Sequence, residues 1–181
     1  TQKVDGSSMT VFYAPCTRED DPFGVCSHNQ ELVIANEASS FVRIEKKIGL
    51  LDKLVESYKE DGIELAVQGE LNGPGIQKNR DNEQEVNFKV FRIWDITHQH
   101  FLTPQERIDW CSKHGIQHVP VIARHFKPFT EFKSMEDILA FSDGLTKNGN
   151  LREGIVYKQE DEKNPITFKV VSNKYLLKEI V

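Results

Sequence analysis

The sequence predicts a mixed α+β domain in which antiparallel sheets are flanked by helices. Its length, 181 residues, suits one domain of ordinary size. Short runs rich in β-branched and aromatic residues predict strands, and segments with apolar residues at helical spacing predict helices. The strand-like runs outnumber the helical segments, and this count favours antiparallel sheets.

The N-terminal half is expected to hold two strands, a long loop and a helix. Small and β-branched residues predict a strand over 7–13, and abundant Asp, Pro, Gly, Ser and Cys predict a loop over 15–29. A helix is predicted over 45–60, because apolar residues recur there every three or four positions. The run 63–70 has the composition of a strand, and a glycine-rich turn follows at 72–75.

The C-terminal half is expected to add strands over 86–96, 117–123, 153–158 and 166–171. Helices are predicted over 104–114, over 134–142 and from residue 173 onward. Thr103 is a suitable N-cap, Pro104 suits the first helical position and Glu106 completes a capping box. Ser134 is expected to cap the next helix in the same manner.

Composition excludes two classes of protein. The formal net charge is −5, so a coat of positive charge like that of a histone is excluded, and nucleic acid would need a local basic surface. No apolar run approaches the ~20 residues of a membrane span, and we expect no membrane partner. Charged residues make up 28%, yet the apolar residues fall into periodic runs, which argues against disorder.

Cysteine usage indicates the compartment. Three cysteines are an odd and sparse set, which fits a reducing intracellular compartment, and we expect the cytoplasm. No signal peptide is apparent. The chain begins with Thr1 and passes directly into a reactive-looking segment, so we expect a fragment trimmed at its N-terminus.

That segment is Lys3-Val4-Asp5-Gly6-Ser7. A lysine can attack an electrophilic phosphorus, but only as the neutral amine, which is scarce at pH 7 with an unperturbed pKa of ~10.4. A burying pocket or nearby positive charge must lower that pKa. Gly6 allows the sharp turn that would project the lysine into a cleft. Taken alone, the motif is also typical of a surface turn.

Four further motifs follow along the chain, at 68–70, 88–91, 152–158 and 168–174. Glu70 ends a strand and could accept hydrogen bonds from ribose hydroxyls. An aromatic residue of the second motif could stack on a purine, and Glu153 could hold a divalent metal. Lys169 lies in an apolar strand, where a cation favours an anionic partner such as phosphate. Each motif alone is equally consistent with a solvated strand end or with core packing.

The order of these motifs resembles the signature of covalent nucleotidyltransferases: DNA ligases, RNA ligases and mRNA capping enzymes. The resemblance covers nearly the whole chain, from Lys3 to Lys174. Segments 23–29, 68–77 and 168–174 are most similar to ATP-dependent RNA ligases of the branch with an OB-like domain before the nucleotidyltransferase domain. The resemblance implies that residues 1–181 are the ligase-type nucleotidyltransferase (adenylylation) domain. It also implies that the OB-like domain and the short stretch that normally precedes the lysine motif are missing from this sequence.

The resemblance implies a role for each matching residue. Lys3 would attack the α-phosphate of ATP and become lysyl-AMP, while Asp5 and Gly6 shape the loop beneath it. Glu153 would organise Mg²⁺ or Mn²⁺, and Lys169 would contact the α-phosphate and offset charge as pyrophosphate leaves. The remaining implied contacts to the nucleotide come from Gln2, Val4, Ser8, Glu70 (ribose) and Phe91 (adenine), with Phe88 as the second choice for the stacking ring.

Three positions depart from the family's pattern. Gln2 stands where this branch usually has Glu, and it is expected to touch the adenine amino group. His28, beside Asn29, stands where Arg is favoured for holding the RNA 3′ end or phosphate, and it is a pH-dependent cation. Val171 stands where many RNA ligases have a second lysine. These changes would tune sealing or weaken it.

The implied function is RNA end joining of the kind used in RNA repair. Lys3 is adenylylated, AMP passes to a 5′-phosphate, and a 3′-OH displaces AMP. The expected partners are RNA ends or a nicked duplex with an RNA 3′-OH strand. Two alternatives stay open: a DNA ligase or GTP-dependent capping enzyme of the same superfamily, and a nucleic-acid-binding module with a weakened active site.

Histidine patterns add two weaker signals. Cys111, His114 and His118 have a spacing that hints at zinc, but Gly115 interrupts the expected helix and no fourth ligand is evident. Two further histidines flank Gln99 on an apparent loop and are expected to be surface residues.

Overall fold

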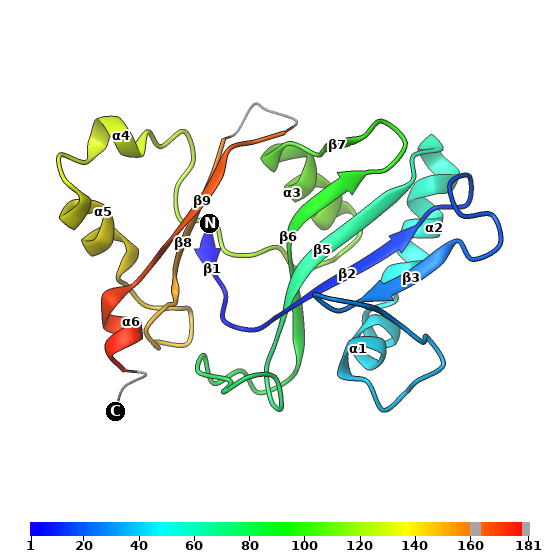
Figure 1. Ribbon diagram of the computed structural model, residues 1–181, viewed down its shortest axis with the longest axis horizontal. Coiled ribbons are helices and arrows are strands. Elements are labelled where there is room, and N and C mark those ends of the chain that lie inside the picture. Colours follow the sequence, from blue (N-terminus) through cyan, green and yellow to red (C-terminus); the bar gives the residue numbers. More distant parts are fainter. Residues whose placement is uncertain (160–163, 179–181) are drawn as a thin grey trace.

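The structure of the chain, a computed structural model, describes residues 1–159 and 164–178. It contains two antiparallel sheets (Figure 1), which confirms the predicted fold class. The larger sheet has the strand order β4-β3-β2-β5-β6-β7, and the smaller has the order β1-β8-β9. The strands are β1 (Gln2–Lys3), β2 (Ser7–Tyr13), β3 (Phe23–Cys26), β4 (Glu31–Leu32), β5 (Leu65–Asn72), β6 (Asn87–Asp95), β7 (His100–Phe101), β8 (Gly154–Lys158) and β9 (Thr167–Val171). The helices are α1 (Ser40–Ile48), α2 (Leu50–Asp61), α3 (Pro104–Lys113), α4 (Pro128–Glu131), α5 (Met135–Ser142) and α6 (Asn173–Leu177).

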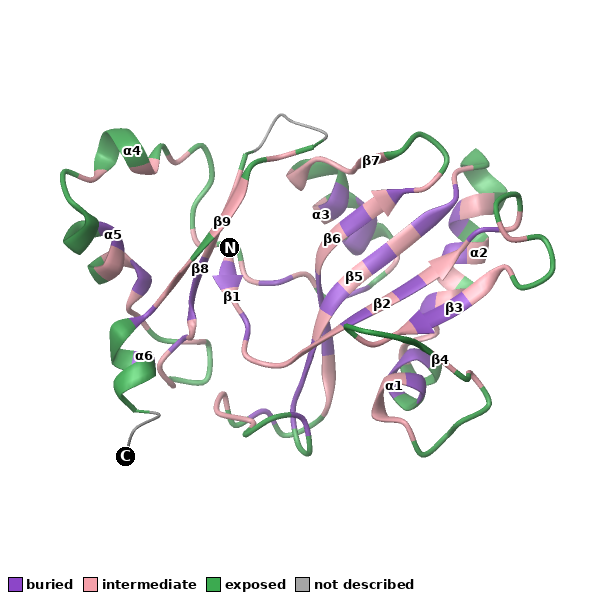
Figure 2. Cartoon of the chain, in the orientation of Figure 1, coloured by how far each residue is buried: buried purple, intermediate pink, exposed green. Residues whose placement is uncertain are grey.

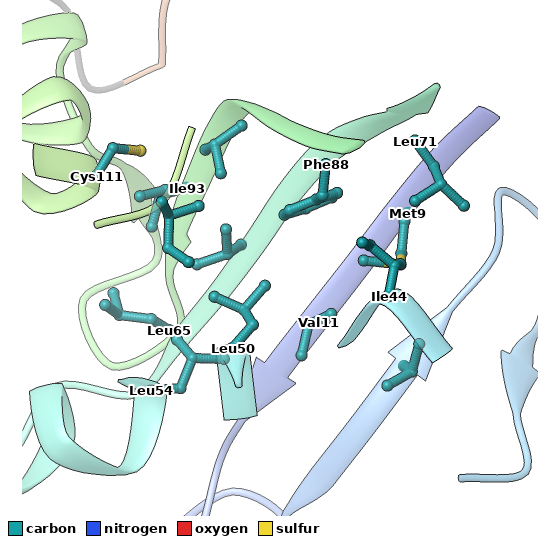
Figure 3. Close-up of a cluster of buried hydrophobic side chains, with 14 of the residues drawn as sticks. Met9, Val11, Ile44, Leu50, Leu54, Leu65, Leu71, Phe88, Ile93 and Cys111 are labelled. Atoms are coloured by element: carbon teal, nitrogen blue, oxygen red, sulfur yellow. The ribbon is translucent and has the colours of Figure 1, made fainter. Parts of the chain in front are cut away.

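The hydrophobic core lies on one face of the larger sheet, beneath α1, α2 and α3 (Figure 1). Strand residues at alternate positions, such as Met9 and Val11 in β2, point to this face. Figure 3 shows them packing against Ile44 of α1 and Leu50 and Leu54 of α2. Strands β2 and β5 are therefore buried largely on alternate residues (Figure 2).

Local signals located the starts of α3 and α5 and the end of α2. Thr103 and Ser134 each form a full capping box, at the start of α3 and of α5. The helix expected over 45–60 is in fact two helices, because Gly49 adopts a left-handed conformation (φ 62°) that ends α1 and begins α2. Its end is as expected: the N–H of Gly62 donates to the Tyr58 carbonyl and closes α2. None of the helices in the described ranges is long and apolar enough to cross a membrane.

Two predictions were wrong, one of a loop and one of a strand. The stretch expected to be a loop over 15–29 contains β3, which pairs with β2. The strand expected over 117–123 is instead a crossing segment between the sheets. Val119 N–H donates to Val90 of β6, and the carbonyl of Pro120 accepts from Gln2 of β1. Because proline lacks an N–H, this segment cannot continue a regular ladder.

The start of the chain joins both sheets. Lys3 pairs with Gly154 in the smaller sheet, and four residues later Ser7 pairs with Leu71 in the larger one. Gly6 makes the crossing possible, because a Cβ there would overlap the Leu71 carbonyl oxygen. The lysine motif therefore lies where the two sheets approach each other.

Candidate functional site

Lys3 forms an ion pair with Glu153, with 2.5 Å between Nζ and Oε1. Their side chains are only 21% and 17% exposed. The pair follows from sheet register, since Glu153 immediately precedes the residue of β8 that faces Lys3. The second oxygen of Glu153, Oε2, is buried and has no hydrogen-bond partner within the described ranges. A buried carboxylate oxygen without a donor is available to a cation.

Glu70 extends this cluster from the larger sheet. Burial raises its pKa to about 7, against the opposing attraction of Lys3; the negative charges of Glu153 and Asp5 add to the rise, and Lys169 opposes it. Three carboxyl groups and two lysines from both sheets therefore interact at one place. Strong pKa perturbation of clustered groups is typical of functional sites.

Asp5 is held by a contact from α6, the last helix of the described chain. The hydroxyl of Tyr175 in α6 donates to its carboxylate, and burial together with this bond raises the pKa of Tyr175. The guanidinium of Arg80 lies over the Tyr175 ring, 4.8 Å from its centroid. The hydrogen bond from Tyr175 fixes the orientation of the Asp5 carboxylate, two residues after Lys3.

Ser8 shares the exposed face of the larger sheet with Glu70. The two residues are direct partners across β2 and β5, and Gln68 donates to the Ser8 hydroxyl at 3.4 Å. Gly69 lies between Gln68 and Glu70, where a Cβ would approach the Phe88 ring to 2.6 Å. Glycine is therefore required for β5 to pack against β6 at this point.

Phe91 occupies a β-bulge. Val90 pairs with Gly69 and Arg92 with Gln68, so Phe91 between them has no partner on β5. A bulge redirects a side chain, and bulges are common beside active sites. Phe91 is half-buried and lies outside the core cluster, whereas Phe88 is 3% exposed and belongs to it. Phe88 as the second choice for a stacking ring was therefore wrong.

Lys158, at the end of β8, was missed as a site residue. Its Nζ donates to the Phe91 carbonyl and lies 5.6 Å from the centroid of the Phe91 ring. Burial lowers its pKa to about 6, and the positive charges of Arg107 and Arg92 contribute. Lys158 also lines a cavity of about 210 Å³ with Thr1 and Tyr157. The sequence feature that could have identified Lys158 is its position at the end of the apolar strand that follows Glu153, the metal-binding candidate.

Asn72 was missed as well. It lies two residues after Glu70 and so projects from the same face of β5. The residue is 2% exposed, and neither Nδ2 nor Oδ1 has a hydrogen-bond partner in the described structure. Its position before Gly73 suggested a turn residue, which concealed this role. A buried, unpaired amide beside Glu70 can bind a polar group of a ligand.

The remaining predicted residues divide into two groups. Gln2 and Val4 are each 7% exposed and flank Lys3 in the chain, with the Gln2 N–H donating to Pro120. His28 and Asn29 are exposed in the turn between β3 and β4, where Ser27 N–H donates to the Gln30 carbonyl. Within the described ranges, no hydrogen bond or ion pair joins His28 or Asn29 to the Lys3 cluster.

The zinc spacing around Cys111 does not produce a metal site in the described part of the chain. Cys111 packs in the core, and burial raises its pKa to about 12. His118 donates to the Val119 carbonyl at 2.5 Å and accepts from Arg107 at 2.9 Å. The ring of His114 packs against Trp110, 4.4 Å between centroids.

The profile of the RNA ligase family matches residues 1–176 of the chain. Among solved structures, an RNA ligase of Naegleria gruberi is similar in three forms. A lysine-to-alanine variant with ATP and Mn has a TM-score of 0.82 and 33% identity, the protein with PPi has 0.80 and 33%, and a lysine-to-methionine variant with AMP and Mn has 0.81 and 32%. The matches cover 99%, 99% and 98% of this chain and 50% of each of those chains.

This chain therefore spans about half the length of the solved ligase chains that it matches. A search of curated protein sequences gave no match. The family profile covers nearly the whole chain, and the fold agrees with that of the Naegleria ligase over the same range. The chain belongs to the RNA ligase family.

Proposed function

We propose that this chain is the adenylylation domain of an ATP-dependent RNA ligase. It would form lysyl-AMP on Lys3, pass AMP to a 5′-phosphate end and join that end to a 3′-OH. The observation that carries the proposal is the ion pair of Lys3 with Glu153, with Glu70 beside it from the opposite sheet. Support also comes from the related ligase, whose structures hold ATP with Mn, AMP with Mn, or PPi.

In the first step, Lys3 Nζ loses a proton and bonds to the α-phosphorus, and the bond to the leaving pyrophosphate breaks. A divalent ion such as Mg²⁺ or Mn²⁺, when bound, would supply positive charge to the phosphate oxygens. Glu153 would hold that ion through its unpaired Oε2, and its Oε1 would then release Lys3 for attack. Lys169 is assigned to the α-phosphate, where its charge offsets the negative charge of the leaving group.

The larger sheet would bind the nucleoside. Phe91 is directed out of the ladder by its bulge, so its ring is available to stack on adenine. Glu70 and Ser8 share one face of the sheet and are assigned to the ribose and to the region of the reacting phosphate. Gln2 and Val4 flank Lys3 and complete the nucleotide site. Asp5, held by Tyr175, keeps the lysine loop in place.

RNA ends are the proposed substrate, with His28 and Asn29 as contacts from the exposed turn. The net charge of −5 makes strong RNA binding by this domain alone unfavourable. The OB-like domain implied by the resemblance stays a prediction, and it would supply a basic surface. The odd and sparse set of three cysteines is the basis for the proposed intracellular, cytoplasmic location.

The test is transfer of label from α-labelled ATP to the protein in Mg²⁺ or Mn²⁺, with GTP in parallel. We expect label from ATP and none in Lys3→Ala. Lys46→Ala is the matched control, because Lys46 is an exposed lysine of α1 on the other side of the larger sheet. Label from GTP alone would favour a capping enzyme. Absence of label from both nucleotides would favour a binding module.

The substrate is tested separately with pre-adenylylated strands, which bypass the first step. We expect joining to an acceptor that ends in an RNA 3′-OH, and much slower joining when that terminal nucleotide is deoxy. Equal rates for the two acceptors would support a DNA ligase instead.

A further inference from the structure

A cluster of three metal-ligating side chains lies outside the proposed nucleotide site, at the tip of the β6–β7 hairpin. Asp95 ends β6, His100 opens β7 and His98 lies in the turn between them. One ligand atom from each residue lies within 4.8 Å of the other two. We propose that this cluster binds a divalent transition metal ion of the zinc class.

The carboxylate of Asp95 is the centre of the cluster. Its side chain is only 3% exposed, and Oδ2 lies 2.8 Å from His98 Nδ1 and 3.8 Å from His100 Nε2. Four-coordinate zinc at 2.0–2.2 Å from each ligand atom requires ligand atoms about 3.4 Å apart. The observed distances bracket that value. The side chain of His98 is 56% exposed, so its ring can rotate to complete the geometry.

Neighbouring backbone groups orient the ligands. The other oxygen of Asp95, Oδ1, accepts the backbone N–H of His98 at 2.8 Å. His100 Nδ1 lies 3.1 Å from the Phe101 carbonyl, which can only accept, so Nδ1 carries the proton. The lone pair of this ring is therefore on Nε2, which faces Asp95. Such outer contacts fix the tautomer and direction of metal-binding histidines.

The donor set determines the class of metal. Two imidazole nitrogens with one carboxylate oxygen suit Zn²⁺, Co²⁺ or Ni²⁺, whereas Mg²⁺ prefers oxygen ligands throughout. The exposed side of His98 leaves the fourth position open to water. Asp95 and His100 are also direct partners in the β6–β7 ladder, so a bound ion would tie the hairpin together at its tip.

This cluster is separate from the Lys3 site. Asp95 pairs with Leu65 at one end of β5, whereas Glu70 pairs with Lys89 five residues along that strand. At about 3.3 Å per residue, the separation is roughly 16 Å along the sheet. One metal ion cannot serve both sites, and the two can be tested independently.

The test is titration of the metal-free chain with Co²⁺, whose visible spectrum reports four-coordinate nitrogen and oxygen ligation, followed by competition with Zn²⁺. We expect one strongly absorbing Co²⁺ per chain, displaced by Zn²⁺. His98→Gln and His100→Gln should each weaken Co²⁺ affinity by more than the ~10–100-fold typical of losing an outer-shell partner. His98 is exposed, so its variant should keep the fold.

Two control variants distinguish Co²⁺ binding at this cluster from Co²⁺ binding elsewhere on the chain. His125→Gln removes an exposed histidine outside the cluster, and Glu153→Gln alters the proposed nucleotide metal site; both should bind Co²⁺ as the parent chain does. Zn²⁺ should also raise the Tm of the parent chain but not of His98→Gln. The proposal is overturned if the parent chain shows no saturable Co²⁺ absorption, if His98→Gln binds unchanged, or if Glu153→Gln alone abolishes the signal.

Discussion

Glu70 has a buried carboxyl group beside two other carboxylates, and its pKa is raised from 4.5 to about 7, chiefly by burial. In the unfolded chain the same group ionises near its ordinary pKa. The folded state therefore binds one more proton between these values, and folding stability falls as pH rises from about 4.5 to about 7. Above pH 7 this loss is complete and amounts to at most ~3 kcal/mol.

Glu70→Gln should remove that loss. We expect the nucleotide-free variant to be more stable than the parent chain at pH 8, by about 1–3 kcal/mol, with the difference shrinking toward pH 5. Urea unfolding at the two pH values measures it. Glu56→Gln, at an exposed position of α2, should show no such dependence. A stability difference independent of pH would show that the carboxyl charge is not its cause.

Single residues of the site differ in how well sequence predicts them. Lys3, Glu70 and Glu153 stand in ordered motifs, and the fold brings all three together. Lys158 was missed because its neighbour Phe91 is distant in sequence, and Asn72 because its position before Gly73 suggested a turn residue. The burial of the Asn72 amide and of the Lys158 amine becomes visible only in the folded structure.

Strand β6 combines a core residue, Phe88, with a residue proposed for the nucleotide site, Phe91, which lies in the bulge. Phe88→Ala should destabilise the domain by about 3–5 kcal/mol, because it empties a buried position. Phe91→Ala should affect stability much less, but should weaken ATP binding by about 5- to 150-fold, as expected for the loss of ~1–3 kcal/mol of base stacking. Urea unfolding and an ATP titration separate the two effects. Unchanged ATP affinity in Phe91→Ala would remove this ring from the nucleotide site.

Gly154 is a constraint on the pairing of β8 with β9. Its φ is +155°, and a Cβ there would overlap the Val170 carbonyl oxygen. Gly149 also has a positive φ, of +78°, but nothing lies within 4 Å of a Cβ at that position. Gly154→Ala should therefore lower stability by clearly more than the ~1–2 kcal/mol of backbone strain expected for Gly149→Ala. Equal losses in thermal unfolding would show that β9 yields to the added methyl group.

Elements with local signals were predicted best. The capping boxes at Thr103 and Ser134 involve residues three positions apart, so sequence alone locates α3 and α5. Strand β3 was missed because four residues within a polar stretch carry little pattern, and its pairing with β2 decides its structure. The segment 117–123 has the composition of a strand, but its partners lie in two different sheets.

At the scale of the whole molecule, the nucleotide would connect the two sheets. Lys3, Glu153 and Lys169 belong to the smaller sheet or its edge, and Glu70 and Phe91 to the larger one. No local pattern predicts which strands share a sheet, since β1 and β8 are separated by most of the chain. The ordered family motifs therefore predicted that these residues form one nucleotide site, but not that the site is divided between two sheets.

A ligand that bridges the sheets should stabilise the whole domain. ATP with Mn²⁺ at about 100 times its Kd should add ~2.7 kcal/mol, which corresponds to a Tm rise of roughly 5–10 °C for a chain of this size. Glu153→Gln should lose most of that rise with Mn²⁺ present. Gln84→Ala, at an exposed position, should keep it. A full rise in Glu153→Gln would place the metal elsewhere.

Lys3 is the residue that we propose forms the covalent bond to AMP. The most direct test is peptide mapping by mass spectrometry after incubation of the chain with ATP and Mn²⁺, under conditions that preserve a phosphoramide bond. We expect AMP on the peptide that contains Lys3, and unmodified peptides containing Lys158 and Lys169. AMP on either of those two lysines, or on a lysine outside the cluster, would contradict this proposal.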